Sequence, residues 1–119
     1  MRIYKFEEIQ SWQKAKELSI GVYKSFSLNK DYGFKDQIQR ASVSVMNNIA
    51  EGYESQTNKM FIRYLYIAKG SCGEVRSMLH LAKEFNYISD EQFEKLYNLS
   101  IDAIRLISGF IKKLNESNH

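Results

Sequence analysis

Hydrophobic residues recur at helical spacing in four separate stretches of the chain. Within each stretch they return at intervals of three and four residues, which places them on one face of an α-helix. We predict helices over residues 6–26, 34–51, 58–85 and 90–114. The short connections carry Asn, Asp, Gly, Ser and Thr, which interrupt helices or cap their ends. The pattern therefore predicts an all-α protein, an antiparallel up-down-up-down four-helix bundle that forms a single domain over residues 1–119.

The third and fourth predicted helices carry more apolar surface than one core face needs. In the third helix a strict heptad seam contains Phe61, Leu65, Ala68, Cys72, Val75, Leu79 and Ala82. A second seam beside it contains Tyr64, Ile67, Ser71, Glu74, Met78, Leu81 and Phe85. Two interpretations stay open: a wide core stripe, or a hydrophobic face that contacts another subunit. The aromatic content of 13% leans toward the interface.

Composition narrows the class of protein further. The chain has no proline and only six glycines, whereas strand-rich domains need turn residues at short intervals. The net charge of +3 comes from interspersed charges, which permit contact with nucleic acid without requiring it. The N-terminus lacks the apolar core of a signal peptide, and no apolar run approaches the length of a membrane span. We expect a cytoplasmic protein with no membrane partner.

The chain lacks the side chains that most catalytic and metal sites require. Cys72 is the only cysteine, which excludes an internal disulfide and a cysteine-based zinc site. Cys72 occupies a heptad core position, and we interpret it as a packing residue. The two histidines are His80, expected to be structural or on the surface, and the terminal His119. Without a nucleophile, base and orienting group, and without a Glu-x-x-His motif, we predict no enzyme, metal, cofactor or small-molecule substrate.

One polar stripe on the second helix stands out. Its members, at helical spacing, are Gln37, Arg40, Ser44, Asn47, Asn48 and Glu51. Such a stripe is usually a solvated face. However, Ser and Asn are poor choices for an exposed helix middle, and the polar Ser71 and Glu74 interrupt an apolar seam of the third helix. A buried Glu74 needs a partner, for which Arg40 is the candidate. The hypothesis is a hydrogen-bonded network of Arg40, Ser44, Asn48, Glu51, Ser71 and Glu74.

Glycines and capping residues add local predictions. Gly52 is placed where a C-terminal glycine usually ends a helix. Gly70 and Gly73 lie inside the third helix, where each costs about 1 kcal/mol relative to alanine. We therefore interpret both as points of close helix–helix approach. Ser89 and Gln92 have the spacing of a capping box at the start of the fourth helix.

Basic side chains are the remaining signal. Lys69, Arg76 and Lys83 repeat every seven residues and so line one outer strip of the third helix. The other candidates for nucleic-acid contact are Lys59, Arg63, Arg105, Lys112 and Lys113. These residues are either an ordinary solvated surface or a phosphate-contacting surface that repetition in an oligomer strengthens.

Two segments carry a resemblance to a known family. Residues 32–52 read YGFKDQIQRASVSVMNNIAEG and residues 61–74 read FIRYLYIAKGSCGE. They resemble the four-helix-bundle family encoded by intervening sequences in bacterial 23S rRNA genes, and the opening helix, with Phe6, Trp12, Ala15 and Leu18, also matches. Ser27 and Met60 depart from the pattern, where the family often has proline and an acidic residue.

The resemblance implies small antiparallel bundles that assemble into homopentameric barrels without enzymatic activity. Some relatives are accessory proteins of diversity-generating retroelements, which contact nucleic acid and a reverse transcriptase. The recurring residues of the family correspond here to Arg40, Asn48, Glu51, Ser71 and Glu74. We therefore expect a non-enzymatic oligomeric module that binds RNA, DNA or a nucleoprotein partner through basic faces of a ring. The alternative is a structural scaffold for protein–protein interaction with no nucleic-acid role.

Overall fold

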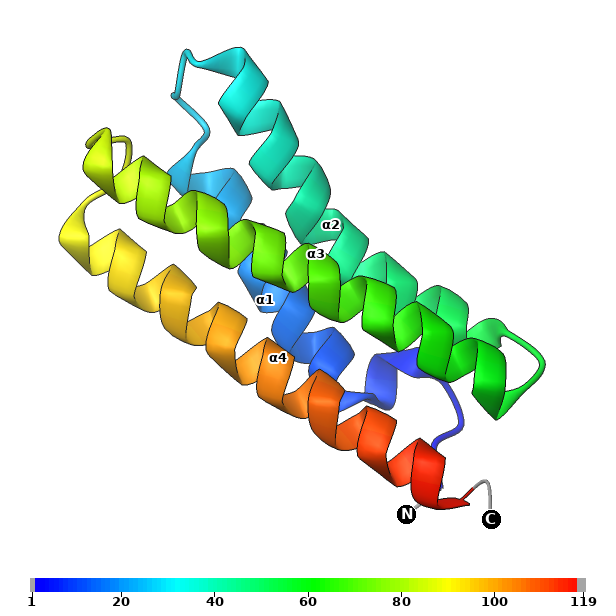
Figure 1. Ribbon diagram of the computed structural model, residues 1–119. Helices are drawn as coiled ribbons and strands as arrows, with labels where there is room; N and C mark the ends of the chain where they lie inside the picture. Colours follow the sequence, from blue (N-terminus) through cyan, green and yellow to red (C-terminus); the bar gives the residue numbers. More distant parts are fainter. Residues whose placement is uncertain (1, 118–119) are drawn as a thin grey trace.

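The computed structural model describes residues 2–117, and it is an elongated antiparallel four-helix bundle (Figure 1). The described part measures 48 × 21 × 20 Å. Its helices are α1 (Gln10–Ser25), α2 (Tyr32–Glu54), α3 (Asn58–Glu84) and α4 (Asp90–Ser117). A short 3₁₀ helix, η1 (Phe6–Glu8), precedes α1. None of the described helices is both long enough and apolar enough to cross a lipid bilayer.

Successive helices run antiparallel (Figure 1), and each packs against two neighbours around the bundle. α3 packs against α2 and α4, and α1 packs against the same two helices. α1 and α3 therefore lie diagonally across the bundle, and their backbones do not pack side by side. This up-down-up-down arrangement is the one predicted from the sequence.

The heptad seam of α3 forms one wall of the core. All seven of its residues, from Phe61 to Ala82, are buried. The second seam behaves differently, because Ile67, Leu81 and Phe85 are each about half exposed, at 47, 46 and 52%. Met78 of the second seam still packs against the core, and an apolar stripe formed by Ile67, Leu81 and Phe85 remains at the surface beside α2.

The predicted start of the first helix at residue 6 was wrong by four residues. Ile9 has extended backbone, with φ −75° and ψ 122°, and it separates η1 from α1. The side chain of Ile9 is only 1% exposed. Burial of the Ile9 side chain in the core stabilises the interruption between η1 and α1. A continuous helix would direct this side chain away from the core.

The second helix extends beyond both predicted ends. The Asp31 side chain accepts a hydrogen bond of 3.2 Å from the backbone N–H of Phe34, so the helix begins at Tyr32. At the other end the helix continues through Gly52 to Glu54. Gly52 therefore does not end the helix, contrary to the prediction.

Gly52 is instead a packing residue between α2 and α3. A Cβ atom at this position would lie 2.7 Å from Phe61 Cδ1 and 2.8 Å from Tyr64 Cβ. Distances this short do not occur between real carbon atoms in contact. Glycine is therefore required because the α3 side chains pack directly on the α2 backbone.

The loops at one end of the bundle are joined across the molecule. Tyr87, between α3 and α4, donates a hydrogen bond of 2.7 Å to Asp31, the N-terminal cap of α2. This bond, followed by the one from the Phe34 N–H, holds the pKa of Asp31 below its ordinary value. The Tyr87 ring also packs edge-on against Phe34, with centroids 5.4 Å apart. At the start of α4, Ser89 and Gln92 form the reciprocal hydrogen bonds of a capping box, at 2.8 and 3.1 Å.

Candidate functional site

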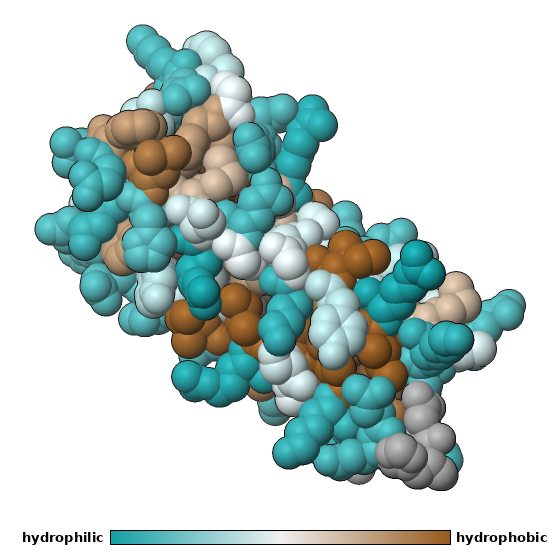
Figure 2. All heavy atoms as spheres, in the orientation of Figure 1, coloured by the Kyte–Doolittle hydropathy of each residue, from teal (hydrophilic) through white to brown (hydrophobic). Residues whose placement is uncertain are grey.

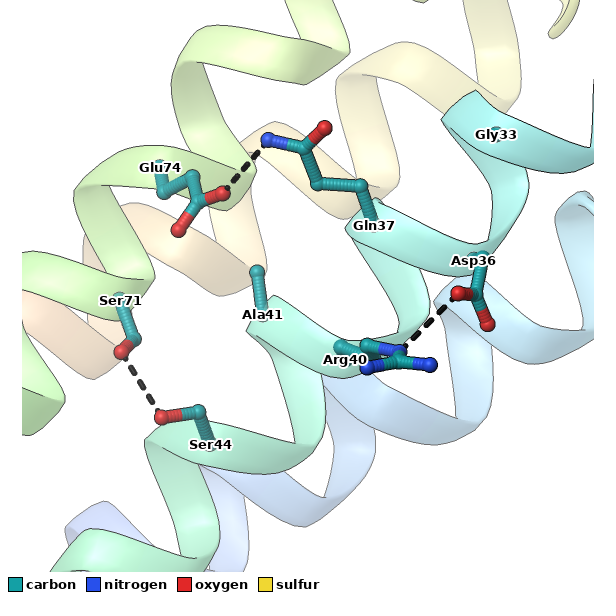
Figure 3. A pocket seen from close by; sticks show the side chains of 8 residues that line it. All are labelled: Gly33, Asp36, Gln37, Arg40, Ala41, Ser44, Ser71 and Glu74. Atoms are coloured by element: carbon teal, nitrogen blue, oxygen red, sulfur yellow. Dashed lines mark hydrogen bonds and ion pairs between the residues drawn. The ribbon is translucent and has the colours of Figure 1, made fainter.

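A shallow polar depression lies between α2 and α3, where the sequence predicted a polar network (Figure 3). Ser44 of α2 and Ser71 of α3 share a hydrogen bond of 2.9 Å. Two turns earlier on α2 and one turn later on α3, Gln37 Nε2 donates to Glu74 Oε2 at 3.0 Å. The depression has a volume of about 530 Å³ and is lined by Gly33, Asp36, Gln37, Arg40, Ala41, Ser44, Ser71 and Glu74.

The predicted pairing of Arg40 with Glu74 was wrong. Arg40 Nε lies 3.0 Å from Asp36 Oδ2, one turn earlier on the same helix, and both side chains are largely exposed. Glu74 is also exposed and is bonded to Gln37. An exposed carboxylate needs no buried counter-charge, so the physical reason for pairing Glu74 with arginine is absent. The i, i+4 spacing of Asp36 and Arg40 was the signal in the sequence for the observed pair.

Asn48 extends the serine pair along α2, whereas Glu51 does not. Asn48 Nδ2 donates to the backbone oxygen of Ser44 at 2.8 Å and to its hydroxyl at 3.0 Å. Glu51 is exposed and makes no hydrogen bond or ion pair within residues 2–117. The six residues of the hypothesis thus separate into a half-buried chain of Asn48, Ser44 and Ser71 and three residues at the surface.

The chemistry of the depression is limited to hydrogen bonding and weak ion pairing. Over the described range, no three or more His, Cys, Asp or Glu side chains are grouped so as to hold a metal ion. Its two serine hydroxyls bond each other, the Ser44 hydroxyl also accepts from Asn48, and no histidine is among the lining residues. We interpret the depression as the polar part of the α2–α3 contact.

Cys72 and His80 lie on faces of α3 that do not line the depression. Cys72 is fully buried, its Sγ lies 3.4 Å from the Ser100 carbonyl oxygen, and burial raises the pKa of its thiol to about 12. His80 is exposed beside the rings of Phe93 and Tyr97, with centroids 5.3 and 5.5 Å away. The other histidine, His119, falls outside the described residues.

Gly70 and Gly73 do not mark close helix–helix contacts within the bundle, contrary to the prediction. A Cβ atom at either position would meet nothing within 4 Å. The same is true of Gly109 in α4. The helices of the bundle thus provide no steric reason for these three glycines, which leave the surface backbone uncovered.

The predicted basic residues divide into two groups. Lys83 lies at the α3–α4 border, with its Nζ 4.6 Å above the ring of Phe93. It and Arg76 belong to the half of the bundle that also carries Glu84, Glu91 and Glu94. The other six residues gather in the opposite half: Lys59, Arg63, Lys69, Arg105, Lys112 and Lys113.

These six residues form what we call the basic surface. On α3, residues 58–73 include Lys59, Arg63 and Lys69 and no acidic residue, and on α4, residues 103–115 include the other three and again none. The two stretches adjoin because α3 and α4 are antiparallel, and the rings of Phe61 and Phe110 lie 5.1 Å apart. Within the described chain, the one ion pair of these cations is a 4.0 Å contact from Arg105 to Asp102.

Comparison with known proteins identifies the family. The model of the family described as 23S rRNA-intervening sequence protein matches residues 7–109. The chain belongs to this family. A crystal structure of a family-related protein, a Bacteroides thetaiotaomicron protein of unknown function from the S23 ribosomal protein family, superposes with a TM-score of 0.80. It is 29% identical and covers 86% of this chain and 98% of its own.

The family assignment agrees with the all-α fold and with the resemblance noted in the sequence. No match was found among curated proteins. The 23S rRNA-intervening sequence family and the Bacteroides thetaiotaomicron structure indicate no catalytic class.

Proposed function

We propose that this member of the 23S rRNA-intervening sequence family is a non-enzymatic cytoplasmic module that self-associates and binds nucleic acid through its basic surface. The observation that carries the proposal is the juxtaposition of six cations on two adjoining segments, residues 58–73 of α3 and 103–115 of α4, which contain no acidic residue. Cations that outnumber the nearby carboxylates, here Asp102 and Glu116, favour phosphate, because binding releases counterions from the nucleic acid. A single copy offers few such contacts, so repetition of the surface in an assembly would raise the affinity.

Exposed apolar side chains support self-association. In the second seam of α3 they include Ile67, Leu81 and, directly after the helix, Phe85, and on α1 they are Ile20 and Tyr23, both 46% exposed. α1 and α3 are not neighbours, so these are two distinct patches. A contact between two different patches is head-to-tail, and it closes into a ring when the rotation between copies permits. The homopentamer implied by the sequence resemblance is one such ring.

The salt dependence of binding tests the nucleic-acid role. We expect the affinity for a fluorescent oligonucleotide to fall steeply with salt, by about 0.7 in log-log slope per single-strand phosphate contacted. Replacing Lys112 and Lys113 by Gln should flatten the slope, because two contacts are lost. A matched control, Lys24→Gln with Lys30→Gln, removes the same charge elsewhere and should leave the slope nearly unchanged. Absence of binding at low salt would contradict the proposal, since phosphate contacts are strongest there.

A protein–protein scaffold is the second candidate, favoured by the apolar stripe of α3. In that case the protein self-associates or captures a protein partner, while oligonucleotides at low salt give no signal. The same titration therefore separates the two functions.

A further inference from the structure

We infer that the basic surface binds single-stranded nucleic acid, with Tyr66 as the residue on which a base stacks. This inference rests on the proposed nucleic-acid role and adds the class of ligand. Figure 2 views the molecule from the side of α3 and α4, where hydrophilic side chains surround separate hydrophobic patches. An alternation of cations and aromatic rings is the arrangement that single-strand binding surfaces use.

Tyr66 is placed among the cations of the basic surface. It is 54% exposed and lies three residues from Arg63 on one side and three from Lys69 on the other. Residues at this spacing lie on neighbouring positions of a helix surface. A base stacked on the Tyr66 ring would therefore have its flanking phosphates within reach of both basic side chains.

Like the exposed Tyr4, Tyr23 and Tyr32, Tyr66 lacks the structural contacts that three other tyrosines make. Tyr53 donates to the Ile3 carbonyl, Tyr87 donates to Asp31, and Tyr97 packs on Phe93. Across residues 2–117, the Tyr66 hydroxyl makes no hydrogen bond and its ring contacts no other aromatic ring. Leaving a large ring half exposed is therefore not explained by the packing of the bundle.

The glycines of α3 continue the same face. Gly70 and Gly73 follow Tyr66 by four and seven residues, so all three lie on one side of the helix. Glycine destabilises a helix interior relative to alanine, and here nothing in the bundle occupies the space beside either residue. Glycine allows a ligand to approach the backbone closely. Together the residues form a flat path beside a projecting ring, bordered by Lys69.

A projecting ring selects single strands over duplexes. In a duplex the bases already stack on one another, whereas in a single strand their faces are available to an aromatic side chain. The acid-free stretch of α3, residues 58–73, has a length of about 22 Å at 1.5 Å per residue. A strand of a few nucleotides can follow this stretch without base-specific contacts.

The test is a comparison of probes at low salt by fluorescence anisotropy on the full-length protein. The probes are oligo(U), oligo(dT) and a mixed-sequence duplex, each of about 16 nucleotides or base pairs. We expect both single strands to bind more tightly than the duplex, and a preference for oligo(U) over oligo(dT) would add a 2′-hydroxyl contact to the same site. Tyr66→Leu should weaken single-strand binding by about 5- to 150-fold and leave duplex binding unchanged.

Two further variants separate stacking from folding. Tyr66→Phe keeps the ring and should bind single strands as wild type does. Tyr23→Leu removes a similarly exposed ring from α1 and should also bind as wild type. Duplex binding as tight as single-strand binding, or unchanged binding by a folded Tyr66→Leu protein, would overturn the inference while leaving the proposed function intact. Absence of binding to all three probes would overturn both.

Discussion

Gly52 and Gly70 are both inside helices, but a methyl group added to each meets opposite surroundings. At Gly52 the new Cβ collides with Phe61 and Tyr64, so we expect Gly52→Ala to lower the free energy of unfolding by about 1–3 kcal/mol. At Gly70 the Cβ meets nothing, so Gly70→Ala should raise it by about 0.5–1 kcal/mol. Urea denaturation in the absence of nucleic acid measures the free energy of unfolding of both variants. Changes of the same sign in the two variants would contradict the packing described here.

Cys72 links burial to the pH dependence of stability. Because burial raises the pKa of its thiol from 9.0 to about 12, the folded state favours the protonated form. Its contribution to stability is therefore complete below pH 9 and is lost as pH rises from 9 toward 12. We expect wild type to lose more stability than Cys72→Ala over this range, measured by urea denaturation at several pH values. Parallel pH profiles would show that the thiolate is tolerated in the core.

At the scale of the helix, periodicity predicted the interior positions better than the ends. All seven heptad positions of α3 are buried, because a helix in a bundle repeats the same environment every two turns. The ends depend on single contacts that periodicity does not contain. Ile9 breaks the first helix because its side chain enters the core, and Gly52 continues the second because Phe61 packs on it.

For the candidate polar network, too, the sequence predicted which residues take part but not which of them contact each other across the helices. Ser44, Asn48 and Ser71 were identified from the sequence because their residue types are unusual at a helix middle. The sequence did not identify the partners of Arg40 and Glu74. Several polar residues share each helix face, and only the register between α2 and α3 decides which of them come into contact. Asp36 and Gln37 take these roles: both lie one turn from Arg40 on α2, and Asp36 pairs with Arg40 while Gln37 bonds Glu74.

The bond between Asp31 and Tyr87 joins two loops and gives a pH-dependent test at this scale. The pKa of Asp31 is lowered mainly by Tyr87, so its contribution to stability is present above pH 3.8 and is lost as pH falls below that value. Tyr87→Phe should lower the melting temperature at pH 7 and lower it less at pH 3. Asp31→Ala should lower the melting temperature at pH 7 more than Tyr87→Phe does, because the cap on the Phe34 N–H is lost as well.

A double-mutant cycle isolates the contact between the loops. The double variant Asp31→Ala, Tyr87→Phe should be about as stable as Asp31→Ala alone, since the tyrosine hydroxyl has already lost its acceptor. Strictly additive losses would mean that the bond contributes nothing to stability.

At the scale of the whole molecule, the basic surface could be only partly predicted. The sequence identified eight basic residues, but the antiparallel packing of α3 on α4 is what brings six of them together. Arg76 and Lys83, grouped with Lys69 by their seven-residue spacing, lie in the half that also contains four glutamates of α3 and α4. One-dimensional spacing finds residues on one strip of a helix and does not show which end of the neighbouring helix lies beside them.

Self-association through two different patches predicts a solution mass that is a multiple of 14.0 kDa at micromolar concentration. Ile67→Glu on α3 or Ile20→Glu on α1 should each reduce the assembly to monomers, because every head-to-tail contact uses both patches. Leu28→Glu is the control, since Leu28 is 91% exposed in the loop after α1. Light scattering and circular dichroism measure the mass and the helix content.

Mixing the two variants tests the geometry of the contact itself. Each variant keeps one intact patch, so an Ile20→Glu copy still offers its α3 patch to the α1 patch of an Ile67→Glu copy. Their equimolar mixture should form dimers and stop there, because the remaining patches both carry glutamate. If the contact instead joined the α3 patches of two copies, Ile20→Glu alone would assemble normally and mixing would add nothing. A wild-type monomer at micromolar concentration would exclude both contacts and leave nucleic-acid binding to the six cations of a single copy.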